Sequence, residues 1–158
     1  MEVIFRRARD LGLPIYSDTP RDRHHKGLSG VVLLLPYLDV FTPSLEEIRP
    51  LCSRIQPDEI AEELLRFGIK TVVLKMESNG ANAYQVAQVW HCPGCPAQVL
   101  DTTGAGDSFC AGFTASSLRD LPIAQTLENG CWCGAQAVRI LGANTSQLDP
   151  SHLPWPLR

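Results

Sequence analysis

Several features are missing from this sequence, and each absence excludes a class of protein. No run of 18 apolar residues occurs, so no segment predicts a transmembrane helix. The first ten residues include Glu2, Arg6 and Asp10 and lack the apolar core of a signal peptide. Only 20% of the residues are charged, and the net charge of -3 comes without the concentrated basic face that nucleic acids require. We therefore expect a cytoplasmic protein that binds neither membranes nor nucleic acid.

Two common nucleotide-binding motifs are also missing. No Gly-x-Gly-x-x-Gly follows an early strand, which argues against a dinucleotide-binding oxidoreductase. No Walker A motif is present either, so any phosphate is expected at a helix end rather than in a Walker loop.

Alternating strands and helices are what the sequence does contain. Strands are expected at 13–16, 38–42, 69–74, 81–90 and 97–100, the last two joined by a loop at 92–96. Helices are expected at 1–10, 45–49, 57–67, from about 104 onward, and at 122–141. This alternation predicts an α/β fold with a largely parallel sheet, and 158 residues suggest one domain.

The segment 101–113 carries the chemistry. It lies where a predicted strand gives way to a predicted helix, and the small residues Gly104, Ala105 and Gly106 let backbone N–H groups approach a ligand closely. A helix N-terminus favours an anion, and Asp107 places a carboxylate beside it. A base next to an anion site suits phosphoryl transfer. The structural alternative is a glycine-rich turn capped by an aspartate.

The same segment, Asp-Thr-Thr-Gly-Ala-Gly-Asp followed by a small-residue helix, resembles the second signature of the ribokinase (PfkB) carbohydrate kinases. The resemblance implies a ribokinase-like fold with a mostly parallel sheet flanked by helices, truncated at its N-terminal side. It implies transfer of the γ-phosphoryl group of ATP to a sugar or sugar-like hydroxyl, with Mg²⁺. Asp107 would be the base, and the N–H groups around Gly104, Ala105 and Gly106 the anion hole.

Two upstream segments extend the resemblance. Ser44 and Glu47 fall on an Asn-x-x-Glu motif, in which the glutamate helps to organise magnesium and phosphate; the alternative for Glu47 is a first-turn carboxylate favoured by the helix dipole. Residues 68–81 resemble the strand and loop that flank the nucleotide. Glu77 replaces a glycine there and is expected to point to solvent, and Lys75 has a surface charge as its alternative. The residues implied to contact the nucleotide in this segment are Lys75, Ser78, Asn79 and Gly80.

Residues 131–143 resemble the last nucleotide-side helix of the family. Cys131 falls on an asparagine that lies near adenine in some members, with core packing as the alternative. A monovalent-cation site for K⁺, present in some members, would be formed by Asp101, Thr103, Gly142 and Ser146. The alternative for Asp101 is a hydrogen bond that closes its own loop.

Members of the family are longer because they carry an N-terminal sugar-binding half. The resemblance therefore implies that residues 1–158 form a single C-terminal nucleotide-binding portion, whose partners are ATP, a sugar-like molecule and either a second copy or the missing half. One alternative is a non-catalytic nucleotide- or phosphate-binding remnant. Another is a zinc module formed by Cys92, Cys95, Cys131 and Cys133, although the closing pair is tighter than usual and lies inside a predicted helix.

Overall fold

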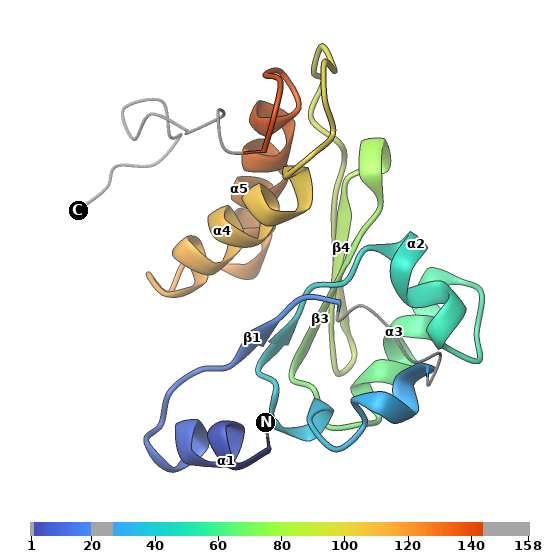
Figure 1. Ribbon diagram of the computed structural model, residues 1–158, viewed down its shortest axis with the longest axis vertical. Coiled ribbons are helices and arrows are strands. Elements are labelled where there is room, and N and C mark those ends of the chain that lie inside the picture. The colour runs from blue at the N-terminus through green and yellow to red at the C-terminus, as the bar shows by residue number, and fades with distance from the viewer. Residues whose placement is uncertain (1, 20–26, 144–158) are drawn as a thin grey trace. The chain divides into compact units, whose positions relative to one another are not determined.

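The computed structural model describes residues 2–19 and 27–143 and contains a five-stranded sheet in the order β1-β2-β3-β4-β5 (Figure 1). The strands are β1 (Tyr16–Ser17), β2 (Val40–Phe41), β3 (Thr71–Lys75), β4 (Ala81–Gln85) and β5 (Gln88–Cys92). The α-helices are α1 (Glu2–Asp10), α2 (Leu45–Ile48), α3 (Pro57–Leu65), α4 (Ala105–Ser117) and α5 (Ile123–Ala137). Short 3-10 helices are η1 (Gly27–Gly30), η2 (Leu35–Tyr37), η3 (Arg49–Leu51) and η4 (Glu77–Asn79).

The chain forms two compact units. The first contains α1 through β3 together with residues 82–90, and the second contains residues 77–81 and the chain from His91 onward, including α4 and α5. Within the described ranges, none of the helices combines the length and apolar character needed to cross a bilayer.

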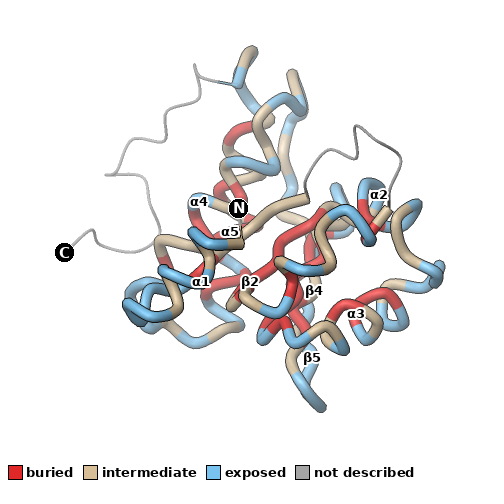
Figure 2. Tube along the Cα trace, turned by 60° about the horizontal axis from the view of Figure 1, so that its bottom comes forward, coloured by how far each residue is buried: buried red, intermediate tan, exposed pale blue. Residues whose placement is uncertain are grey.

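Three parallel strands form the centre of the first unit. Tyr16 pairs with Val40, and Val40 pairs with Thr71, so the three strands run in register. The first four residues of β3 are buried, as expected for a strand covered on both faces. Figure 2 shows buried segments along β2 and β4, and the side chains of Phe41, Ile60 and Val72 belong to this core. The predicted strand at 69–74 is therefore confirmed, with a small shift of its ends.

Local signals placed α3 correctly. Pro57 occupies its first position, where the missing N–H costs nothing. Gly68 has a φ of +93°, the left-handed conformation that glycine adopts readily after a helix. Ile60 and Leu64 lie one turn apart on α3, and both are fully buried. This face packs against β3, as the helical spacing of these apolar residues predicted.

The predicted single strand at 81–90 is wrong, because the chain reverses in its middle. β4 and β5 are joined by Val86 and Ala87, and Ala87 takes a left-handed φ of 61° to make the turn. A two-residue connection requires antiparallel strands, so the sheet is mixed rather than largely parallel. No Asn-Gly or Asp-Gly pair marks this turn, so no hairpin is predicted from the residues at 86–87.

The strand predicted at 97–100 does not form either. Leu100 N instead donates to the carbonyl oxygen of Val138 at 2.8 Å, and Asp101 N donates to the same oxygen at 3.2 Å. The side chains of Val99 and Leu100 are 59% and 58% exposed, so the apolar pattern here does not correspond to burial. Helix α5 ends at Ala137, four residues before the predicted end. The carbonyl group of Val138, the next residue, therefore accepts from this loop.

Helices α4 and α5 form the core of the second unit and touch through glycines. A Cβ at Gly112 would collide with the Cys133 sulfur, and one at Gly130 would lie 3.0 Å from the Phe109 ring. Inside this contact, the buried Asn129 Nδ2 donates to Ser116 Oγ at 2.8 Å. Interiors packed this closely have few alternative arrangements, so α5 fixes the direction in which the N-terminus of α4 points.

Candidate active site

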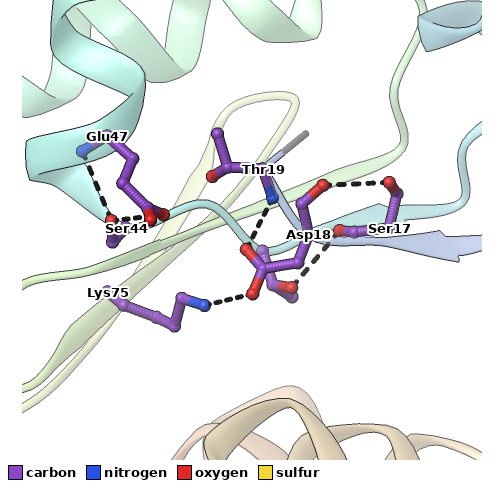
Figure 3. A network of polar contacts seen from close by, with 7 residues as sticks. Ser17, Asp18, Thr19, Ser44, Glu47 and Lys75 are labelled. Atoms are coloured by element: carbon purple, nitrogen blue, oxygen red, sulfur yellow. Dashed lines mark hydrogen bonds and ion pairs between the residues drawn. The ribbon is translucent and has the colours of Figure 1, made fainter. Parts of the chain in front are cut away.

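Polar side chains meet at the carboxyl ends of β1, β2 and β3 (Figure 3). Asp18 follows β1, Ser44 lies just beyond β2, and Lys75 ends β3. Ser44 and Lys75 form an isolated parallel bridge, which shows that the strand ends lie side by side. Ligands of open α/β sheets bind outside the carboxyl ends of the strands, so this edge is a candidate site.

Lys75 is held by Asp18 and is not a surface charge. Its ammonium lies 2.6 Å from Asp18 Oδ2, and the lysine side chain is only 11% exposed. The other carboxylate oxygen, Asp18 Oδ1, accepts from Thr19 N at 2.7 Å. Sequence reasoning missed Asp18, although a carboxylate directly after a strand of a parallel sheet is the signal that marks this position.

Ser44 and Glu47 interact with each other at the start of α2. Ser44 Oγ accepts from Glu47 N at 3.3 Å and donates to Glu47 Oε2 at 2.8 Å. Serine thus caps the helix where the family motif has asparagine. The Glu47 carboxylate is exposed, so the same residue serves the helix start and presents oxygen atoms to solvent.

The loop at 77–80 has a strained backbone, and a second loop packs closely against it. Glu77 has a φ of 51°, in the left-handed region that favours glycine, which accounts for the glycine that the family pattern has at this position. Its side chain is exposed, as expected, and so are Ser78 and Asn79. A Cβ at Gly80 would collide with the Cys92 carbonyl, and one at Gly94 would collide with the Ser78 carbonyl. Two loops therefore meet here backbone to backbone.

The N-terminus of α4 forms the predicted arrangement of small residues and a carboxylate. Gly104 is the N-cap with a φ of 81°, and no side chain caps the helix. The first helical bond runs from Ser108 N to Gly104 O at 2.9 Å, while Ala105 N donates to Thr102 O at 3.2 Å. The N–H groups of Gly106 and Asp107 therefore precede the helical ladder, where an anion is favoured. The side chain of Asp107 is exposed in this first turn.

Asp101 closes the loop that leads into α4. Its Oδ1 atom accepts from Thr103 Oγ1 at 2.7 Å and from Thr103 N at 2.9 Å, and its Oδ2 atom accepts from Gly142 N at 2.8 Å. These bonds, above all the one from the Thr103 hydroxyl, hold the pKa of Asp101 below its usual value. Three of the four residues predicted for a cation site are thus brought together. Ser146 lies outside the described residues.

Cys131 lies on α5 in the buried interior of the second unit, as the core-packing alternative expects. Its side chain is 8% exposed, and burial raises the pKa of its thiol. Among residues 2–19 and 27–143, no three His, Cys, Asp or Glu side chains are grouped so that they could hold a metal ion. Cys92, Cys95, Cys131 and Cys133 therefore do not form the zinc module considered as an alternative.

Parallel strands with polar ends in the first unit, and a glycine-capped helix N-terminus beside a carboxylate in the second, place the chain among α/β proteins. Comparison with family models gives the particular family. The model of the pfkB family carbohydrate kinases matches residues 1–150, and the chain belongs to this family.

Individual relatives agree with this assignment. The chain is 27% identical over 130 residues to an ATP-dependent 6-phosphofructokinase of Thermoanaerobacterium thermosaccharolyticum, a match over 82% of this chain and 40% of that enzyme. It is 32% identical over 111 residues to the fructoselysine 6-kinase of Escherichia coli, over 70% of this chain and 40% of that enzyme. The chain thus spans about 40% of the length of these curated relatives.

Solved structures share the fold. Aminoimidazole riboside kinase from Salmonella enterica, in complex with aminoimidazole riboside and an ATP analogue, superposes with a TM-score of 0.85 at 24% identity over 96% of this chain and 55% of that one. Ribokinase from Arabidopsis thaliana, with ribose and ATP, superposes with a TM-score of 0.80 at 23% identity over 94% of this chain and 48% of that one. The predicted ribokinase-like fold is therefore confirmed.

Proposed function

We propose that this chain is the nucleotide-binding portion of an enzyme that transfers the γ-phosphoryl group of ATP to a hydroxyl of a sugar or sugar-like molecule. The observation that carries the proposal is the N-terminus of α4, where the exposed Asp107 carboxylate adjoins N–H groups that precede the helical ladder. The family membership and the ATP-bound structural neighbours support the choice of nucleotide and of acceptor class.

Each part of the α4 N-terminus has a role in this proposal. The carboxylate of Asp107 accepts the proton of the attacking hydroxyl as its oxygen bonds to phosphorus. The N–H groups of Gly106 and Asp107 donate to the phosphoryl oxygens, where negative charge increases in the transition state. Gly104 allows the turn, because its φ of 81° is strained for other residues and a Cβ there would lie 3.1 Å from Ala143. The N–H of Ala105 already donates to the carbonyl oxygen of Thr102, so it does not donate to phosphate. Ala105 contributes only a small side chain.

Nucleotide contacts are assigned to two further places. In the second unit, the exposed η4 loop offers Ser78 and Asn79, and Gly80 keeps that loop against its neighbour. Cys131 is assigned to the nucleotide from its position on α5, where its side chain is buried. In the first unit, Lys75 supplies a positive charge that Asp18 holds in place at the strand ends.

Two cations are part of the proposal. Mg²⁺ prefers oxygen ligands and binds through one or two carboxylates together with phosphate, and the exposed Glu47 carboxylate is a ligand of this kind. A bound Mg²⁺ would neutralise charge on the phosphates; one structural neighbour is a complex with ATP and Mg²⁺. A monovalent cation such as K⁺ would take oxygen atoms of Asp101, Thr103 and Gly142, which lie together in the described structure.

The decisive experiment removes the base and keeps its shape. Asp107→Asn should lower the rate of sugar phosphorylation by a factor on the order of 10² or more, as loss of general-base catalysis does, with little change in ATP affinity. The phosphorylation rate is measured in a form of the enzyme that includes a sugar-binding half. The affinity for ATP is measured with the 158-residue chain. Asp120→Asn, at an exposed aspartate just beyond α4, is the matched control and should keep the rate. Normal turnover by Asp107→Asn would exclude the role.

A second variant tests the anion site separately. Gly106→Val introduces a branched side chain beside the N–H groups that precede the ladder, so the affinity for a non-hydrolysable ATP analogue should fall while circular dichroism stays unchanged. A variant with intact affinity would leave this turn as a structural cap.

A non-catalytic nucleotide-binding protein is the second candidate. It rests on the N–H groups ahead of the α4 ladder, which can bind phosphate whether or not a proton is transferred. The same experiments distinguish the two functions. Nucleotide binding that is lost in Gly106→Val, without phosphoryl transfer to any acceptor even when a sugar-binding half is present, would select this second candidate.

A further inference from the structure

The hydroxyl of Thr19 is a buried polar group for which the described residues supply no partner. Its oxygen atom Oγ1 is enclosed, and no atom of residues 2–19 or 27–143 is placed to form a hydrogen bond with it. Among the buried side-chain oxygen and nitrogen atoms of these residues, it alone is unsatisfied. An unpaired buried polar group costs free energy, so nearly all such groups in proteins have a partner and this exception requires an explanation.

A chain of hydrogen bonds fixes Thr19 at the carboxyl ends of the parallel strands. Thr19 lies two residues beyond the end of β1, and its backbone N donates to Asp18 Oδ1 at 2.7 Å. The other carboxylate oxygen, Asp18 Oδ2, accepts from the ammonium of Lys75 at 2.6 Å. Figure 3 shows Thr19 in the same cluster of polar side chains as Ser44 and Glu47. The unpaired hydroxyl therefore belongs to the edge at which open α/β sheets bind ligands.

The charges around this hydroxyl favour a phosphate oxygen as its partner. The Lys75 side chain is only 11% exposed, so its positive charge is screened less than that of a surface lysine. The charge of Asp18 is engaged on both oxygen atoms, by Lys75 and by Thr19 N. The exposed Glu47 carboxylate opposes an anion, and the Mg²⁺ of the proposed function balances it. A phosphate oxygen accepts the hydroxyl proton and also attracts the ammonium, whereas an uncharged sugar hydroxyl lacks the second interaction.

We propose that the Thr19 hydroxyl donates to an oxygen atom in the phosphate chain of the nucleotide, beside the Lys75 ammonium. The inference rests on the proposed function and adds a binding residue that lies outside the segments resembling the family. Thr19 transfers no proton in the reaction. Because a charged acceptor satisfies the buried hydroxyl, the free energy lost to the unpaired group contributes to the affinity for the ligand.

Isosteric replacement of Thr19 tests the contact in the 158-residue chain. Thr19→Val keeps the branched shape and removes the hydroxyl, so the affinity for a non-hydrolysable ATP analogue should fall about tenfold, as loss of a hydrogen bond to a charged group does. Thr19→Ser keeps a hydroxyl and should restore most of the affinity. Equal affinities of Thr19→Val and the unmodified chain would overturn the inference.

Two further ligands locate the contact on the nucleotide. Tripolyphosphate carries the phosphate chain alone, and its affinity should fall in Thr19→Val together with that of the ATP analogue. Adenosine carries only the base and the ribose, and its affinity should stay unchanged. A loss of adenosine affinity in Thr19→Val would overturn the assignment to phosphate.

The unpaired state of the hydroxyl is measured without ligand, by urea unfolding. Thr19→Val should keep or raise the unfolding midpoint, because valine removes a buried hydroxyl that lacks a partner. Thr42→Val is the matched control. Thr42 is 4% exposed and its hydroxyl donates to the carbonyl oxygen of Ser17 at 3.3 Å, so this variant should lower the midpoint. A lower midpoint in Thr19→Val would show that the protein itself binds the hydroxyl and would refute the premise.

These measurements also separate the inference from the proposed function. If the unmodified chain bound neither the ATP analogue nor tripolyphosphate, the proposed function would fail and the inference with it. If the unmodified chain and Thr19→Val bound the analogue equally well, only the inference would fail. Binding of tripolyphosphate that depends on Thr19, without preference for the ATP analogue, would retain the phosphate contact and refute its assignment to a nucleotide.

Discussion

The ammonium of Lys75 lies 2.6 Å from Asp18 Oδ2, although 57 positions separate the two residues in the chain. The contact joins the carboxyl end of β3 to the segment that follows β1, across the intervening strand β2. Lys75 is largely enclosed, whereas Asp18 is 37% exposed, so water solvates only one partner well.

Removal of the lysine charge should therefore have a measurable cost. Lys75→Met keeps the length and apolar volume of the side chain but removes the ammonium that lies 2.6 Å from Asp18 Oδ2, and we expect a loss of about 1–2 kcal/mol in the free energy of unfolding. Arg66→Met is the control, because Arg66 pairs with Glu62 where both side chains are exposed; it should cost less than about 0.5 kcal/mol. Urea unfolding measures both, and equal losses would contradict the special position of Lys75.

The left-handed backbone at Glu77 predicts a stabilising substitution. Glu77→Gly should raise the free energy of unfolding by about 1 kcal/mol, because a left-handed conformation costs a residue with a Cβ on that order and glycine little. Glu77→Ala removes the carboxylate but keeps the strain, so it should leave the stability nearly unchanged. Thermal and urea unfolding of the two variants separate backbone strain from charge. A stabilised alanine variant would attribute the effect to the carboxylate instead.

The hydrogen bonds to Asp101 predict a pH effect with a definite sign. Because the pKa of Asp101 is lowered in the folded state, its bonds stabilise the fold above the unfolded pKa, about 3.9, and this contribution is lost as the pH falls through the folded pKa. Thr103→Val removes the hydroxyl donor and should raise the pKa of Asp101 toward its ordinary value. Carbon-detected NMR titration measures the pKa of the Asp101 carboxyl group directly. Thr102→Val, at the exposed neighbour, is the control and should leave the Asp101 titration in place.

We expect the 158-residue chain by itself to turn over no sugar efficiently. Phosphoryl transfer needs an acceptor hydroxyl held in line with the γ-phosphate, and the chain covers only about 40% of its curated relatives. β1 is also an edge strand whose outer side lacks a partner strand in the described sheet, and such edges promote association. The assay offers a panel of sugars and nucleosides with ATP and Mg²⁺. Rapid turnover of any one acceptor would show that this portion suffices.

Local signals in the sequence determined much of the fold. Pro57 and Gly68 marked the ends of α3 because proline and glycine have strong backbone preferences, and Gly104 marked the start of α4 for the same reason. The β-branched run before Lys75 identified the central strand. The hairpin between β4 and β5 was missed because Ala87 makes its turn without the usual turn residues, and the apolar pattern at 97–100 was misread because its backbone bonds go to α5.

The candidate site was predictable where one short segment forms it. Residues 101–107 carry the helix N-terminus and the carboxylate together, so their juxtaposition follows from local geometry. Asp18 was not predictable in this way, because its role depends on a partner at the end of β3. Relationships between distant segments require the tertiary structure.

The N–H groups ahead of the α4 ladder belong to the main chain, and this has a consequence for sequence drift. Every amino acid except proline carries the same N–H, so substitutions at Gly104, Ala105 and Gly106 change the shape of the cradle and leave its hydrogen-bonding chemistry intact. Asp107 is different, because its proposed role lies in the side chain. Natural variation in this turn should therefore be limited by the volume and backbone angle of the first three residues, and by charge at the fourth.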